Sequence, residues 1–171
     1  ELSAELKCEE FARACSLGMF DYLRKSRSQG FVLSLSGGAD SSSVAALVYL
    51  MCAFGVKELG LAGIKERLGY AGGKFDHCKN LAGLVNAILT CVYQRTANNS
   101  EATEQAAKEL TDGIGAQFFN WSVDELVGKY VSLIQEHLGY HPTWEQDDIA
   151  LQNIQARVRS PGIWLVANLK N

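Results

Sequence analysis

The clearest chemical signal in the chain is a short segment rich in glycine and hydroxyl groups, S-L-S-G-G-A-D-S-S over residues 34–42. It follows the apolar run 31–33 and precedes a helical pattern of apolar residues, which predicts a tight turn between a strand and a helix. Glycine lets the backbone approach a ligand closely, and the unpaired N–H groups at a helix N-terminus attract phosphate. We therefore predict that this segment is a phosphate-binding loop.

Asp40 gives this loop a further chemical capacity. Its carboxylate lies at the start of the predicted helix, where it could hold a cation beside bound phosphates. Other glycine signatures do not fit, because no Lys follows the glycines as in G-x-x-x-x-G-K-[ST], and G-x-G-x-x-G is absent. The alternative interpretation is an ordinary strand-to-helix turn in which Ser36 or Asp40 caps the helix.

A second polar pattern, L-Q-N-I-Q-A-R-V-R, covers residues 151–159. On a helix, Asn153 and Arg157 are four residues apart and project to the same side. A face that offers amides and a guanidinium suits a polyanionic substrate, because Arg can grip phosphate or carboxylate with two hydrogen bonds. A solvated helix face carrying surface ion pairs is the alternative.

Composition narrows the classes of function. The formal net charge of the 171 residues is −3, and no basic tract is longer than Arg24-Lys25, which disfavours nucleic-acid binding as the main role. No apolar segment reaches the roughly 20 residues of a membrane span, and no signal peptide is visible. The five cysteines are odd in number and lack C-x-x-C spacing, which favours reduced thiols in a cytoplasmic protein. His77-Cys78 lacks a second pair of ligands for structural zinc.

Alternating patterns predict the elements that position these motifs. Helices are expected over 2–25, 41–54 with a stop at Gly55, 100–110, 122–138 and 147–168, and strands over 31–35, 88–93 and 117–121. Ser122 and Glu125 have the spacing of a capping box, and Pro161 is expected to bend the last helix. Residues 57–87 are predicted to be short helices and loop.

This order predicts an α/β fold, a doubly wound parallel sheet with helices on both faces. The phosphate loop would then lie at the carboxyl ends of the strands, where open α/β sheets bind ligands.

The two motifs together resemble a known family. S-G-G-x-D-S-S closely resembles the pyrophosphate loop of ATP pyrophosphatases. With D-D-I-A-L-Q-N-I-Q-A-R-V-R at 147–159, the chain resembles NAD synthetase, especially the synthetase domain of the glutamine-dependent enzymes. The resemblance spans about residues 10–55 and 88–171, and 57–87 looks like an insertion. It implies the adenine nucleotide alpha-hydrolase-like (ATP pyrophosphatase) fold.

The resemblance implies a reaction. ATP adenylates the nicotinate carboxylate of deamido-NAD with loss of pyrophosphate, and ammonia then displaces AMP to form the amide. The implied cofactors are ATP and Mg²⁺. Residues 36–38 and 40–42 would carry the ATP phosphates, Asp40 would be the catalytic magnesium ligand, and Asn153 and Arg157 would contact the dinucleotide. Arg95 is either a nucleotide contact or an exposed loop arginine.

The resemblance also implies partners. Glutamine-dependent relatives carry a nitrilase-like glutaminase domain that supplies ammonia, and the family usually dimerises through the synthetase domain. The glutaminase domain and the family's further C-terminal half-site are not recognised in residues 1–171. We therefore expect one domain over 1–171, incomplete at its C-terminus, inactive alone and forming a homo-oligomer.

Other classes of function fit the loop alone. One is another pyrophosphate-loop enzyme, such as a GMP synthetase, an asparagine synthetase or a tRNA-thiolating enzyme, although residues 151–159 favour NAD synthetase. A non-catalytic module would bind AMP or ATP without releasing pyrophosphate. A structural interaction domain could use Tyr140, Trp144 and Trp164 at an interface, but single aromatics are more often core residues.

Overall fold

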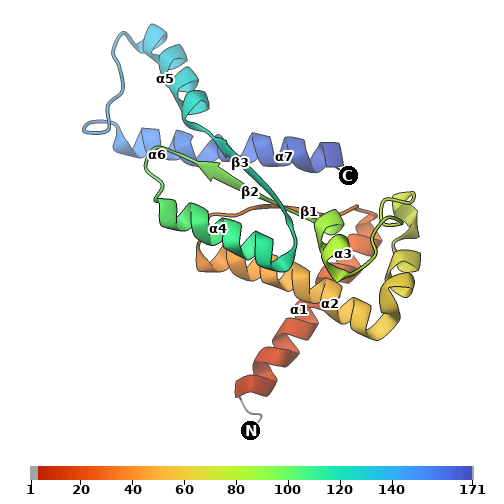
Figure 1. Cartoon of the computed structure of the whole chain (residues 1–171). Coiled ribbons are helices and arrows are strands. Elements are labelled where there is room, and N and C mark those ends of the chain that lie inside the picture. The colour runs from red at the N-terminus through yellow and green to blue at the C-terminus, as the bar shows by residue number, and fades with distance from the viewer. Residues whose placement is uncertain (1–3, 171) are drawn as a thin grey trace.

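The computed structural model describes residues 4–170, which form a three-stranded parallel sheet with helices on both faces (Figure 1). The elements in chain order are α1 (Ala4–Ser26), β1 (Phe31–Ser34), α2 (Ala39–Arg67), η1 (Gly69–Ala71), α3 (Leu81–Ile88), β2 (Leu89–Arg95), α4 (Glu101–Ile114), β3 (Gln117–Ser122), α5 (Asp124–Leu138), α6 (Asp148–Arg157) and α7 (Arg159–Lys170). The fold class and the order of elements predicted from the sequence are confirmed.

The strands are ordered β1-β2-β3, so β2 is central. Ser34 of β1 and Phe119 of β3 both lie opposite Val92. The central strand is buried except at Arg95, whereas β1 and β3 are only partly buried at the sheet edges. Because all three strands run in the same direction, their carboxyl ends meet at one edge of the sheet, which we call the carboxyl edge.

Helices cover the sheet unequally. α2 and α4 lie on one face, α7 lies on the other, and α1 packs along α2 (Figure 1). The core between α1, α2, α3 and the sheet includes fully buried Leu23, Val48, Leu84, Leu89 and Tyr93. The phosphate loop is thus held between the end of β1 and the start of a long, well-packed helix.

Gly55 does not end the helix after the loop, contrary to the prediction. The helix continues to Gly60, where the backbone leaves the helical conformation at φ 69° and ψ 164°, and a second helical piece then folds back. A Cβ on Gly55 would lie 2.3 Å from Cδ1 of Ile64. The glycine therefore makes room for the buried Ile64 side chain instead of stopping the helix.

The length of α2 corrects a second expectation. By length and composition alone, its 29 residues are apolar enough to cross a membrane, although the sequence pattern predicts no apolar segment of that size. The helix begins in the polar loop, kinks at Gly60, and packs against α1 and the sheet.

Residues 57–87 form short helical pieces and turns, as predicted. They contribute the buried side chains of Leu68, Phe75 and Cys78 to the core. Asn80 begins α3, because its side chain accepts a hydrogen bond from the N–H of Gly83 at 2.8 Å. That this segment is an insertion stays a prediction.

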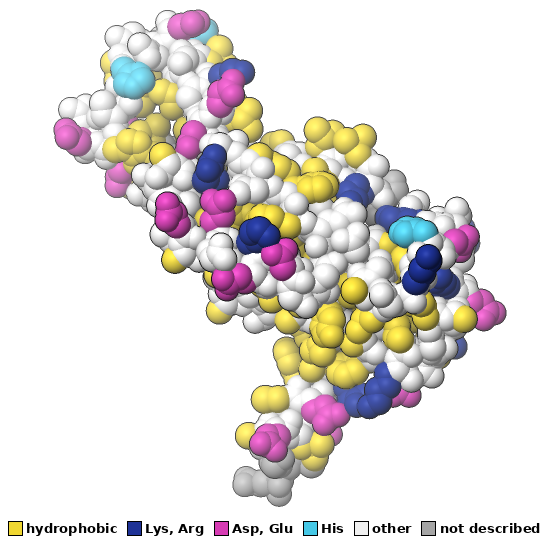
Figure 2. Space-filling model, viewed as in Figure 1, with side chains coloured by type: hydrophobic (Ala, Val, Ile, Leu, Met, Phe, Trp, Pro, Cys, Tyr) yellow, Lys and Arg dark blue, Asp and Glu magenta, His cyan; other side chains and the backbone are white. Residues whose placement is uncertain are grey.

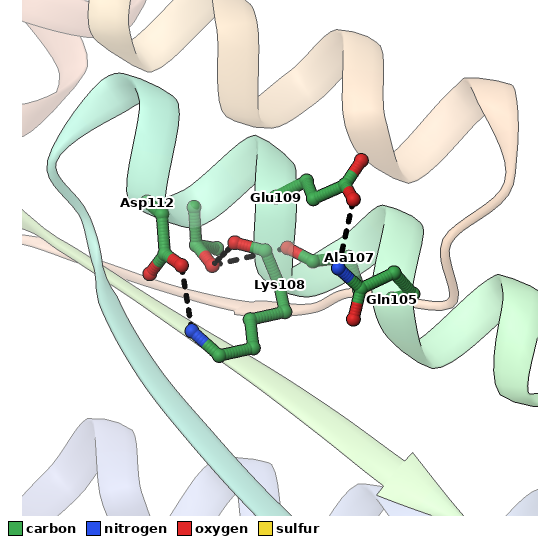
Figure 3. A network of polar contacts seen from close by, with 6 residues as sticks. Gln105, Ala107, Lys108, Glu109 and Asp112 are labelled. Atoms are coloured by element: carbon green, nitrogen blue, oxygen red, sulfur yellow. Dashed lines mark hydrogen bonds and ion pairs between the residues drawn. The ribbon is translucent and has the colours of Figure 1, made fainter.

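The outer face of α4 carries pairs of side chains four residues apart (Figure 3). Gln105 donates to Glu109 at 2.7 Å, and Lys108 pairs with Asp112 at 2.6 Å. Ser100 caps the helix as predicted, but the helix continues past Leu110.

In the C-terminal part, the expected capping box is wrong, whereas the expected interruption of the last helix near Pro161 is observed. Ser122 and Glu125 form no capping box, because α5 is preceded by Val123 and the Ser122 hydroxyl accepts from Asp124 N at 3.2 Å. The last helix is divided at Val158 into α6 and α7, three residues before Pro161. Proline has no N–H to donate and its ring crowds the carbonyl four residues earlier, which explains a break just ahead of it.

Candidate functional site

The predicted phosphate loop connects β1 to α2 at the carboxyl edge. Leu35 anchors it, because its side chain is buried and its N–H donates to the carbonyl of Val92 at 2.9 Å. Gly37 then takes a left-handed conformation at φ 78°, which L side chains rarely adopt. The loop therefore turns away from the sheet within a few residues.

Two serines brace the loop from side to side. Their hydroxyls, on Ser36 and Ser41, lie 3.1 Å apart. Ser36 Oγ accepts from Gly38 N at 3.2 Å, while Ser41 Oγ accepts from Ser36 N at 3.2 Å and donates to the Gly38 carbonyl at 3.3 Å. The side chains of the loop thus fix its conformation. Ser36 is exposed and Ser41 is half-buried.

The first turn of α2 has no side-chain cap. Gly38 is the N-cap residue in an extended conformation, and Ser42 N donates to its carbonyl at 3.1 Å. The alternative in which Ser36 or Asp40 caps the helix therefore fails. Free N–H groups at a helix start, together with the helix dipole, favour an anion at this point.

Asp40 is exposed in that first turn. Within residues 4–170, no hydrogen bond or ion pair engages its carboxylate. The same described residues contain no group of three or more His, Cys, Asp or Glu side chains that could hold a metal by themselves. A divalent cation at Asp40 would therefore need ligands from a bound phosphate, which is how Mg²⁺ is usually held at nucleotide sites.

A polar network that sequence reasoning missed supports the loop from α4. Tyr93 Oη and Thr103 Oγ1 are 2.9 Å apart, and Asn99 Nδ2 donates to Tyr93 Oη at 3.0 Å. Thr96 N donates to Asn99 Oδ1 at 3.0 Å. A Cβ on Gly37 would lie 2.2 Å from the carbonyl oxygen of Thr103, so α4 is packed against the loop. The available sequence signal is the polar run directly after β2, which by itself predicts only a turn and a cap.

Asn153 and Arg157 lie on one exposed side of α6, as predicted. Arg157 Nη1 donates to Asn153 Oδ1 at 2.7 Å, so the two side chains pair with each other. The helix junction behind them reaches the carboxyl edge, where Gln94 Nε2 donates to the Arg159 carbonyl at 2.9 Å. Arg95 is exposed where β2 ends. The roles of these side chains toward a ligand stay predictions.

The described cavities lie away from the predicted loop contacts. One of about 450 Å³ lies between parts of α1 and α2 and is lined by Phe20, Met51 and Phe54, among others. Another of about 450 Å³ lies between α5 and the segment 141–144. Neither is lined by the loop, which lies open on the surface of the domain.

A family model, a curated relative and a solved structure all relate this chain to NAD synthetases. The sequence profile described as NAD synthase matches residues 11–171. The glutamine-dependent NAD(+) synthetase of Oryza sativa subsp. indica is 39% identical over 173 residues, which cover 94% of this chain and 23% of that protein. The crystal structure of a glutamine-dependent NAD(+) synthetase from Cytophaga hutchinsonii is 46% identical with a TM-score of 0.86, covering 94% of this chain and 29% of that one.

A more distant structure extends the likeness in fold. The glutamine-dependent NAD+ synthetase from Acinetobacter baumannii, solved in complex with adenosine diphosphate, is 19% identical with a TM-score of 0.64. It covers 94% of this chain and 24% of that one. The chain thus spans about a quarter of the length of each of these three proteins.

Proposed function

The chain belongs to the NAD synthase family, and we propose that it is the ATP-binding part of a ligase that converts deamido-NAD to NAD. The observation that carries the proposal is the Ser36–Ser41 braced loop in front of an uncapped helix N-terminus. It lies at the edge of a parallel sheet where ligands bind. The relatives named above as glutamine-dependent NAD(+) synthetases support the same reaction.

In the proposed reaction, a carboxylate oxygen of the nicotinate attacks the α-phosphorus of ATP. The bond to the β-phosphate oxygen breaks and pyrophosphate leaves. Ammonia then attacks the carbonyl carbon of the acyl-adenylate, AMP leaves, and the nitrogen loses a proton to give the amide. The loop residues 36–38 and 40–42 would hold the phosphates, because N–H groups and hydroxyls oriented in advance stabilise charge as it develops on pyrophosphate.

Magnesium fits this loop through Asp40. The carboxylate is exposed and has no partner within residues 4–170, and Mg²⁺ commonly takes one or two carboxylates together with substrate phosphates. When bound, the ion would neutralise charge on the leaving pyrophosphate. Asn153 and Arg157 would contact the dinucleotide, since a guanidinium already oriented by Asn153 can grip a phosphate or carboxylate.

We further propose that the longer protein takes ammonia from glutamine through a nitrilase-like glutaminase domain and acts in the cytoplasm. Its relatives are about four times longer and carry glutamine in their names, which supports a separate nitrogen-supplying part. The five cysteines are all free thiols, as expected in a reducing compartment.

A homo-oligomer is part of the proposal, and the support is an apolar surface. α5 and α7 expose large apolar side chains, and Figure 2 shows hydrophobic atoms gathered over both. The residues are Leu126, Tyr130, Leu133, Ile134, Leu138, Trp164, Leu165 and Leu169. Trp164 is 69% exposed, which favours an interface aromatic over a core residue. Sedimentation of the full-length protein as a monomer would overturn this part.

The experiment that tests the function is pyrophosphate release by the full-length protein with ATP, Mg²⁺ and ammonium. Deamido-NAD, xanthosine monophosphate and aspartate are compared as acceptor acids. Release with deamido-NAD alone supports the proposal. Release with another acid keeps the loop chemistry and overturns the substrate. ATP binding without release under any condition indicates a non-catalytic nucleotide-binding module.

A further inference from the structure

Gln94 is a buried amide that connects the two halves of the proposed site. Gln94 is only 6% exposed and lies near the carboxyl end of β2. Gln94 Nε2 donates to the carbonyl of Arg159 at 2.9 Å, and Gln94 Oε1 accepts from the hydroxyl of Ser34 at 3.4 Å. One side chain therefore joins the last residue of β1, just before the phosphate loop, to the first residue of α7.

The junction between α6 and α7 is fixed at this point by close packing. Val158 is 5% exposed, and its N–H closes the last turn of α6 on the carbonyl of Ile154 at 3.0 Å. A Cβ on Gly162 would lie 3.2 Å from Trp121 Cζ2 and 3.6 Å from Gln94 Nε2. α7 therefore starts in direct contact with the ends of β2 and β3.

Arg157 depends on this junction for its position. Its guanidinium bonds only within α6, to the Asn153 carbonyl and side chain, among the contacts that the described residues make. The distance between that guanidinium and the phosphate loop is therefore set by where the α6–α7 junction is held. Gln94 is the side chain that ties the junction to the strand end beside the loop.

We propose that Gln94 is a positioning residue that sets the position of the dinucleotide-binding helix α6 relative to the ATP-binding loop. It acts through the main chain of Arg159 and touches neither substrate. The inference rests on the proposed function, in which the loop and α6 hold the two substrates. Its consequence is that Gln94 governs how well the dinucleotide binds, while the loop, braced by its own serines, binds ATP without it.

The test is steady-state kinetics of the full-length protein carrying Gln94→Met, which keeps the volume and removes both hydrogen bonds. We expect the KM for deamido-NAD to rise about fivefold to tenfold, as for one or two lost buried hydrogen bonds. The KM for ATP should stay within about twofold. Gln105→Met, which removes an amide paired with Glu109 on the outer face of α4, is the matched control and should leave both values unchanged (Figure 3).

A double-mutant cycle separates positioning from general stability. In an Arg157→Ala background there is no guanidinium left to position, so Gln94→Met should raise the KM for deamido-NAD by less than about twofold more. A full additional rise, or an equal rise in the KM for ATP, would show a merely structural role and overturn the inference. If Gln94→Met does not fold, Ser34→Ala removes the hydroxyl that donates to Gln94 Oε1, tests the same link from β1, and should give the same split between the two KM values.

The two proposals fail differently. A wild-type protein that turns over deamido-NAD and a Gln94→Met variant with unchanged KM would overturn the positioning role alone. A wild-type protein that does not turn over deamido-NAD would overturn the proposed function, and with it this inference.

Discussion

The backbone of Gly37 lies so close to Thr103 that a Cβ at this glycine would be 2.2 Å from the Thr103 carbonyl oxygen. The glycine also has a φ of 78°, in the left-handed region. Position 37 therefore requires glycine for two reasons. One is the left-handed conformation, and the other is the close approach of α4. The Thr103 hydroxyl in turn pairs with the hydroxyl of Tyr93, two residues before the end of β2.

We therefore predict that Gly37→Ala weakens ATP binding by at least about tenfold. The left-handed conformation costs a residue with a Cβ about 1–2 kcal/mol, and the clash with backbone adds to it. Isothermal titration calorimetry of ATP with the full-length protein measures the effect. Gly113→Ala is the matched control, because a Cβ on Gly113, inside α4, would meet nothing within 4 Å, and this variant should bind ATP normally.

Asp40→Ala is expected to lower pyrophosphate release at least about a hundredfold with the fold intact, because the exposed carboxylate has no structural partner to lose within residues 4–170. Circular dichroism would check that the fold is intact, and a titration of activity against Mg²⁺ would check the loss of pyrophosphate release. Asp112→Ala removes a surface pair with Lys108 and should change neither. Near-normal activity of Asp40→Ala with unchanged magnesium dependence would remove Asp40 from the site.

Arg157→Ala is expected to raise the KM for deamido-NAD about tenfold or more, since a charge-assisted hydrogen bond is lost, and to leave the KM for ATP within about twofold. Initial rates with each substrate varied in turn give the two values. Arg13→Ala, which removes a pair with Glu9 on α1 at 2.9 Å, is the matched control. Equal changes in both KM values would take Arg157 away from the dinucleotide.

The phosphate loop is predictable from the sequence because the interactions that shape it are local. The bracing hydrogen bond joins Ser36 and Ser41, five residues apart, and the following helix begins within the same motif. Alternating strands and helices are likewise visible in stretches of a few residues. These features indicate the fold class, the place of the loop and the shared face of Asn153 and Arg157.

The contacts that hold the loop in place are not predictable in the same way, because they join distant parts of the chain. Gln94 and Arg159 are 65 residues apart, and Ser34 and Gln94 are 60 apart. A glycine in a sequence also does not tell whether it ends a helix or admits a neighbour. Gly55 has the sequence pattern of a helix stop, yet it makes room for Ile64 within α2.

Stability should fall steeply in alkaline solution because of two buried thiols. Burial raises the pKa of Cys52 and of Cys91 to about 12, while an unfolded thiol ionises near pH 8.5–9. The stabilisation is complete below about pH 8.5 and is lost as pH rises toward 12, with a slope of up to about 1.4 kcal/mol per pH unit for each thiol. Guanidinium unfolding between pH 8 and 10.5 measures the slope. Cys91→Ala should remove the contribution of that thiol and lower the slope, and an unchanged slope would contradict this.

The most direct test of carboxylate adenylation traces the oxygen atoms of the nicotinate carboxylate into the products. Deamido-NAD labelled with ¹⁸O at both carboxylate oxygens is converted by the full-length protein with ATP, Mg²⁺ and ammonium, and the products are analysed by mass spectrometry. If the carboxylate attacks the α-phosphorus of ATP, one ¹⁸O appears in AMP and the other stays in the amide of NAD. Label in pyrophosphate, or AMP without label, would contradict adenylation of the carboxylate at this loop.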